Sequence, residues 1–144
     1  MIRIVIPGLP VAQGRPRLAV VGGHARAYSP AKATSWRGAA QVHMQDALRR
    51  CEQSAFPPGV PLRVQVDAVW PQPASAPKRD RASRRYRPSR PDADNVGKAV
   101  LDAGNGILWH DDAQVAVLLV RKITGASGEP PRVAVSVDLI REAL

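Results

Sequence analysis

Two carboxylates one residue apart, Asp92 and Asp94, are the residues of this sequence whose spacing points most directly to chemistry. Like charges this close repel each other unless a cation joins them. A second acidic pair, Asp111 and Asp112, follows an Asn-Gly turn at 105–106 and precedes an apolar run. Hard divalent cations such as Mg²⁺ take oxygen ligands and keep several waters. Carboxylates from these two segments could therefore hold one or two such ions and leave positions for a substrate phosphate.

A metal held in this way would stabilise charge on a phosphodiester and generate hydroxide at neutral pH. The charge balance favours such an anionic substrate, because 21 Lys and Arg stand against 12 Asp and Glu, a formal net charge of +9. Proteins this basic usually bind nucleic acid or an anionic membrane. Residues 71–90, directly before the first acidic pair, are rich in Pro, Ser and Arg, and we predict a mobile loop that contacts a phosphate backbone. Its basic residues are Lys78, Arg79, Arg81, Arg84, Arg85, Arg87 and Arg90.

A purely structural role for the acids is the alternative. Residues 94–103 have helical periodicity. Asp92 or Asp94 could cap this helix, and Asp94 could pair with Lys98 at i,i+4. Capping requires only one acid, however, and it leaves the downstream acidic pair without a role. The apolar face of the helix would hold Val96, Ala99, Val100 and Ala103, and its polar face Asp94, Asn95, Lys98 and Asp102.

The elements that must position these residues form an α/β (α+β) fold in one domain, residues 1–144. Strands are predicted at 2–6, 61–70, 115–123 and 132–140, the last antiparallel to the one before. A hairpin turns at Gly22-Gly23, and a long helix begins at Ser29-Pro30 and ends near Cys51. We therefore expect a mixed sheet of about four strands with two main helices packed on it.

Several classes of protein are excluded by what the sequence lacks. Cys51 is the only cysteine, so the chain has no internal disulfide and no cysteine-based zinc site, and we expect a cytoplasmic protein. Neither a signal peptide nor a membrane span is predicted. No Gly-rich phosphate loop is present, which argues against a nucleotide cofactor. An EF-hand starting at Asp92 fails because Val96 and Ala103 occupy positions that require oxygen ligands.

Residues 90–106, RPDADNVGKAVLDAGNG, and residues 109–115, WHDDAQV, together resemble the motif of RusA-type Holliday junction resolvases. Pro7-Gly8, the segment 14–17 and the segment 28–30 also resemble phage and prophage members of that family. The similarity spans nearly the whole chain.

The resemblance implies a homodimeric, Mg²⁺-dependent endonuclease of DNA recombination and repair, with Mn²⁺ as a substitute metal, that nicks four-way DNA junctions symmetrically. A dimer also suits the reaction, since two symmetric cuts need two equal sites. By position, the catalytic, metal-binding acids are Asp92, Asp94 and Asp112, and the catalytic lysine is Lys98. Supporting positions are Asn95, Asp102, Asp111 and Gln114. Arg15 and Arg17 join the basic loop as expected DNA contacts.

Two other functions fit the same residues. One is a non-catalytic protein that binds branched DNA, in which the acids only cap and solvate the helix. The other is a metal-dependent nuclease that acts on other branched or single-stranded DNA. A nicking assay with Mg²⁺ and with EDTA on a junction, a flap and a linear duplex separates all three.

Overall fold

The computed structural model of the protein describes residues 1–14, 17–28 and 31–142. Its elements in chain order are β1 (Ile2–Pro7), β2 (Arg17–Val21), β3 (His24–Tyr28), α1 (Ala31–Arg50), β4 (Leu62–Trp70), the 3₁₀ turn η1 (Lys78–Asp80), β5 (Arg85–Tyr86), α2 (Ala93–Gly104), the 3₁₀ turn η2 (Asp112–Gln114), β6 (Val115–Thr124) and β7 (Arg132–Leu139).

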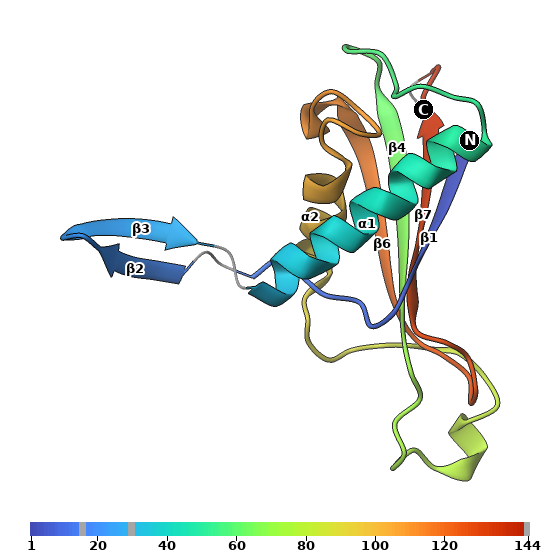
Figure 1. Ribbon diagram of the computed structural model, residues 1–144. Helices are drawn as coiled ribbons and strands as arrows, with labels where there is room; N and C mark the ends of the chain where they lie inside the picture. Colours follow the sequence, from blue (N-terminus) through green and yellow to red (C-terminus); the bar gives the residue numbers. More distant parts are fainter. Residues whose placement is uncertain (15–16, 29–30, 143–144) are drawn as a thin grey trace.

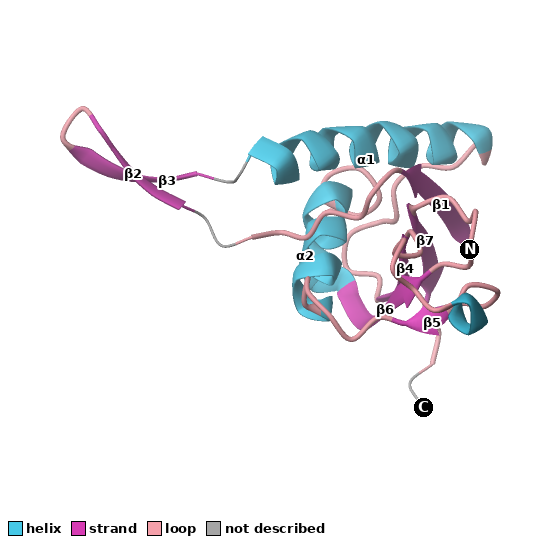
Figure 2. Cartoon of the chain, turned by 90° about the horizontal axis from the view of Figure 1, so that it is seen from below, coloured by secondary structure: helices cyan, strands magenta, loops and turns pink. Residues whose placement is uncertain are grey.

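A mixed five-stranded sheet in the order β1-β7-β4-β6-β5 forms one layer, and α1 and α2 cover one of its faces (Figures 1 and 2). The predicted α+β architecture with two main helices is therefore confirmed. One detail differs, because β7 runs antiparallel to β6 but does not pair with it. Instead, β4 lies between them, parallel to β6 and antiparallel to β7. Neither helix combines the length and the apolarity needed to cross a bilayer, within the described residues.

Apolar periodicity explains both layers. In β1 the side chains of Ile2, Ile4 and Ile6 are buried and alternate with exposed residues, as expected for a strand with one face on the core. The helices bury residues at three- and four-residue spacing. They meet the sheet in one continuous core, which includes Trp36, Ala40, Met44 and Ala47 of α1 and Val96, Val100 and Ala103 of α2.

The hairpin predicted at Gly22-Gly23 is present as β2 and β3, which pair only with each other (Figure 1). It extends away from the sheet and from both helices in the two views (Figures 1 and 2). The predicted start of α1 at Ser29-Pro30 lies outside the described residues. The helix is described from Ala31 and ends at Arg50, close to its expected end.

Residues 71–90 contain more structure than the predicted loop. Arg81 donates to the carbonyls of Ala76 and Ala74, which closes the segment around η1. Further along, β5 pairs antiparallel with the end of β6, with Arg85 opposite Thr124 and Tyr86 opposite Ile123. This segment therefore becomes the short outer strand of the sheet before it leads into α2.

A tight turn connects α2 to η2 and is built around the fully buried Trp109. The Trp109 indole donates to the Asn105 side chain at 3.0 Å, and the Gly106 N–H donates to the Trp109 carbonyl at 2.8 Å. The ring also lies against the backbone of Gly104, where an added Cβ would come within 2.4 Å of the Trp109 Cζ2 atom. Residue 104 must therefore lack a side chain for the turn to close.

We predict that Gly104→Ala lowers the free energy of unfolding by roughly 1–3 kcal/mol, because an overpacked core must shift to admit the new methyl group. Gly38→Ala is the matched control. Gly38 is exposed in the middle of α1, and an added Cβ there meets nothing within 4 Å. This control should raise stability by about 0.5–1 kcal/mol through helix propensity. Urea unfolding measures both values, and a Gly104→Ala variant as stable as the parent contradicts the packing argument.

Candidate active site

The first turn of α2 is held against the end of β6. The Lys122 ammonium donates to the carbonyls of Ser89 and Pro91, each at 2.8 Å, and so fixes the chain just before the helix. Asp92 occupies the N-cap position, with extended backbone angles, yet its side chain makes no capping hydrogen bond. The capping role offered by the purely structural alternative is therefore not taken by this carboxylate, although its position is that of a cap.

The pairing of Asp94 with Lys98 that a purely structural role would need is not formed, because the Lys98 side chain turns the other way along the helix. Its ammonium lies 3.4 Å from Asp102, one turn further on, and Asp102 is also 4.0 Å from Arg37 of α1. Asp102 thus links the two helices and orients Lys98. Asp94 makes no hydrogen bond or ion pair in the described part of the chain, and its side chain is exposed.

Asp92 and Asp94 therefore carry negative charge that no neighbouring side chain compensates within the described residues. Two cations of this region are engaged elsewhere, since Lys122 binds carbonyls and Arg87 donates to the Arg90 carbonyl at 3.0 Å. Two exposed carboxylates at the positive end of a helix dipole make an oxygen donor set open to a cation. That donor set fits a hard divalent ion that keeps part of its water shell.

In the second acidic pair Asp111 holds the local structure, and Asp112 beside it is half-buried. Asp111 accepts a hydrogen bond from the Ala113 N–H at 2.9 Å, and Gln114 accepts from the Asp111 N–H at 3.2 Å, which forms a capping box on η2. The bond from Ala113, and then the adjacent Asp112, hold the pKa of Asp111 below its usual range. Gln114 also donates to the carbonyl of Pro57 at 2.7 Å. Asp111 and Gln114 thus hold the turn that carries Asp112.

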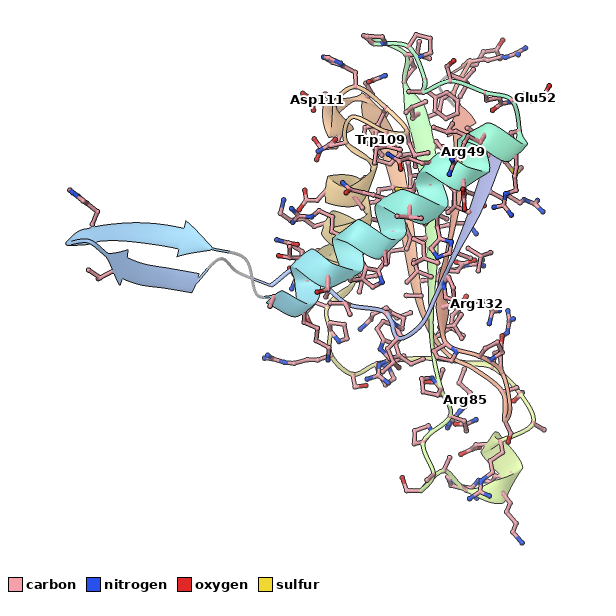
Figure 3. All side chains as sticks on the ribbon, in the orientation of Figure 1. Arg49, Glu52, Arg85, Trp109, Asp111 and Arg132 are labelled. Carbon is pink, nitrogen blue, oxygen red and sulfur yellow. The ribbon has the colours of Figure 1, made fainter. Side chains whose placement is uncertain are left out.

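The two acidic pairs lie at opposite ends of α2 and β6. Val115 is level with Leu62 at the start of β4, whereas Lys122, which holds the first turn of α2, is level with Ala68. Seven residues of strand separate the two levels, about 23 Å at about 3.3 Å per residue. Figure 3 shows Asp111 at the end of the sheet opposite Arg85. No three acidic, histidine or cysteine side chains converge on one point within the described residues. Asp92 and Asp94 therefore share the start of α2, whereas Asp112 lies toward the other end of that helix in the same chain.

The basic residues expected to contact DNA differ in how firmly their side chains are held. Arg84 and Arg132 both bind Glu129 on the β6–β7 connection, and they lower the Glu129 pKa to about 2. Arg85 on β5 binds Asp80 and Gln72 of the preceding loop, and so holds this part of the loop against the edge of the sheet. Among the remaining predicted contacts, Arg81 is anchored within the loop and Arg87 stacks over the Trp70 ring at 4.8 Å. Lys78, Arg79 and Arg90 are exposed. The side chain of Arg17 is not described, and Arg15 lies outside the described residues.

Two residues that organise this region were not anticipated from the sequence. The apolar patterns predict only that Lys122 lies at the end of a strand and that Arg37 lies in a helix. A signal for Lys122 exists, because it alternates with Val120 and Thr124 on the side of β6 that faces the helices. A charged residue at an inward strand position needs partners, and here they are loop carbonyls. No comparable sequence signal marks Arg37.

The fold and the site together define a small α+β protein with exposed paired carboxylates beside a basic segment. Comparison with known sequences identifies the family, since the profile described as endodeoxyribonuclease RusA matches residues 7–138. The chain is also 34% identical over 145 residues to the uncharacterized protein YqaN of Bacillus subtilis (strain 168), covering 98% of this chain and 96% of that protein. The chain belongs to the RusA family, and it is an endodeoxyribonuclease of the Holliday junction resolvase class.

Proposed function

We propose that this protein resolves four-way DNA junctions by paired symmetric nicks, as a Mg²⁺-dependent homodimer. The observation that carries the proposal is the uncompensated carboxylate pair Asp92 and Asp94 on the first turn of α2, in a chain of the RusA endonuclease family. In this family the reaction is hydrolysis of a phosphodiester, so the acids would act on an anionic substrate that only a cation can bring close to them.

The third proposed ligand, Asp112, needs a second copy of the chain to reach this pair. Within one chain it lies at the other end of α2, and the levels of β6 beside the two acidic segments are about 23 Å apart. A two-fold axis near the middle of β6 would reverse the direction of the second copy. The remote Asp112 of one copy would then lie near Asp92 and Asp94 of the other.

An unpaired strand edge supports such a dimer. One edge of β6 pairs with β4 along its whole length. Within the described residues the opposite edge is paired only at its end, where β5 pairs with Ile123 and Thr124 and the Arg87 N–H donates to the Lys122 carbonyl. Because backbone groups alternate along a strand, the N–H and C=O groups of Ala116, Leu118 and Val120 point to this same edge, where no strand pairs with them in the described part of the chain.

Side chains along this edge are apolar and exposed, at 42% for Val117, 41% for Leu118 and 47% for Leu119. A long apolar edge strand is a template for pairing with another chain. The sheet's other edge, β1, is less suited to pairing, because it carries Arg3 and ends in Pro7. Antiparallel pairing centred on Leu118 would give hydrogen-bond partners to the unpaired backbone groups of Ala116, Leu118 and Val120. It would also place Val117 opposite Leu119 of the other copy.

In this assembly each site would combine groups from both chains. Asp92 and Asp94 of one copy and Asp112 of the other would hold the metal, which when bound supplies positive charge and a water of lowered pKa. Lys98, oriented by Asp102 at 3.4 Å, would place its ammonium beside the phosphate and offset the negative charge that grows during cleavage. Two such sites related by the two-fold axis would make the paired cuts.

Asp92→Asn, Asp94→Asn and Asp112→Asn should each abolish cleavage of a junction in Mg²⁺ while junction binding persists, because each removes a metal ligand and none removes a basic contact. Lys98→Ala should bind as well as the parent and cleave at least about a hundredfold more slowly. Single-turnover cleavage and gel-shift binding give the two readouts on a junction, a flap and a duplex. Asp138→Asn on β7 is the control and should cleave normally.

If any of the three acid variants keeps near-parental turnover, that residue is not a ligand. Cleavage of the flap as fast as the junction would favour the broader branched-DNA nuclease over the resolvase.

Val117→Lys/Leu119→Lys should convert the dimer to monomer, since it replaces two apolar edge residues and sets like charges opposite each other across the two-fold axis. The dimer dissociation constant should rise at least about a hundredfold, in line with about 1.5–3 kcal/mol for each apolar side chain. Val5→Lys, equally exposed but on β1, is the matched control and should remain dimeric. Sedimentation equilibrium measures both; a dimeric double variant places the interface elsewhere.

A further inference from the structure

Tyr86 is an exposed aromatic residue in a basic setting. It lies on β5, opposite Ile123 of β6, and 77% of its surface is exposed. Of the aromatic side chains whose exposure the structure describes, it alone is exposed; Trp36, Trp70 and Trp109 are buried and Phe56 is half-buried. The core therefore gains little from this ring, whose side chain instead interacts with Arg121.

Three arginines line the same hollow as the ring, and each is held by an acidic side chain. Tyr86 and Ile123 line a hollow of about 230 Å³ together with Arg84, Arg85 and Arg121. Arg121 is held by a bidentate pair to Asp67, with both N–O distances at 2.6 Å. Arg84 is held by Glu129, and Arg85 by Asp80 at 3.2 Å. The acids therefore hold these cations beside the hollow that the Tyr86 ring also lines.

This combination suits an unpaired nucleobase. Proteins that bind single strands place bases on aromatic faces and hold the backbone with nearby cations. Arginine contributes both by contact with phosphate and by stacking. The hollow is smaller than the roughly 300–1,000 Å³ of typical small-molecule pockets, so it suits one ring system rather than a whole nucleotide. A base inside a continuous duplex is stacked on both sides and cannot use it.

The backbone links this hollow to the catalytic acids. After Tyr86, the Arg87 N–H donates to the Lys122 carbonyl at 2.9 Å, and the Lys122 ammonium holds the carbonyls of Ser89 and Pro91. Lys122 thus fixes both ends of the short segment between Tyr86 and Asp92. Six residues of extended chain span at most about 22 Å, a separation that a DNA strand of a few nucleotides covers. Tyr86 shares the sheet face of Arg121 and Ile123, opposite the helices, so a strand that reaches both sites bends around the sheet edge.

We propose that Tyr86, framed by Arg84, Arg85 and Arg121, is a stacking site for an unpaired nucleobase next to the strand that is cut. The inference rests on the proposed function, because it names the feature of branched DNA that the enzyme reads: a base released from its stack near the branch point. The acids would perform the cleavage, and this subsite would favour branched over continuous DNA.

The test compares Tyr86→Leu, which keeps an apolar side chain but loses the aromatic face, with Tyr86→Phe, which keeps the ring. Binding is measured in EDTA, so that no cleavage intervenes, to a four-way junction, a linear duplex and a single-stranded oligonucleotide that carries the fluorescent base 2-aminopurine. Thermal unfolding confirms that both variants fold.

Tyr86→Leu should weaken binding to the junction and to the single strand by roughly 5- to 150-fold, the range expected for one stacked base, and leave duplex binding unchanged. The fluorescence of the unpaired 2-aminopurine should fall on binding the parent and Tyr86→Phe, but not on binding Tyr86→Leu. Parental affinity of Tyr86→Leu for all three DNAs, or an equal loss on all three, overturns the stacking site.

The same experiment separates failure of this inference from failure of the proposed function. A protein that cleaves junctions but is indifferent to Tyr86→Leu keeps its function and loses the subsite. A protein that cleaves no DNA, yet shows Tyr86-dependent quenching with the single strand, keeps the subsite as a binding site and loses the proposed activity. Absence of binding to every DNA overturns both.

Discussion

The rest of the proposed site depends on two exposed carboxylates at the start of α2, Asp92 and Asp94, whose side chains have no partner within the described residues. A protein with a formal net charge of +9 has ample cations to neutralise two acids, yet three cations of this region bind other groups. Lys122 donates to backbone carbonyls, Arg87 to the carbonyl of Arg90, and Lys98 to Asp102. Within the described residues the carboxylates are thus left open to a ligand from outside the chain, as the proposed metal site requires.

The scaffold keeps these charges in place through close packing of α2 on β6. At Gly97 an added Cβ would lie 3.0 Å from Val120 and 3.1 Å from Leu118, so the helix backbone rests directly on the strand. A glycine inside a helix costs about 1 kcal/mol in propensity, and the close approach accounts for it here. Since α2 lies directly over the apolar edge of β6, any chain that pairs with that edge is set at a fixed position relative to the acids.

Much of this could be predicted from the sequence, and the exceptions have physical causes. The ranges of β1, β4, α2, β6 and β7 follow from apolar periods, and the paired acids stand out by their spacing. The insertion of β4 between β6 and β7 could not be predicted, because strand order depends on packing between distant segments.

Side-chain partners were harder still to predict. Lys98 has acids at both i−4 and i+4, Asp94 and Asp102, and the local spacing does not decide which of the two it binds. The distance between Asp112 and Asp92 depends on the direction in which α2 and β6 run. Local patterns do not encode that direction.

The sharing of each site between two copies is tested most directly by mixing two inactive variants. Asp92→Asn and Asp112→Asn are co-expressed with different tags, and the heterodimer is purified through both. If Asp92 of one chain works with Asp112 of the other, one of the two sites in the heterodimer is fully parental. The purified heterodimer should then nick a four-way junction in Mg²⁺ on one strand only, whereas each homodimer is inactive. A heterodimer that forms but leaves the junction uncut contradicts the shared site, because it would mean that each chain must supply all of its own acids.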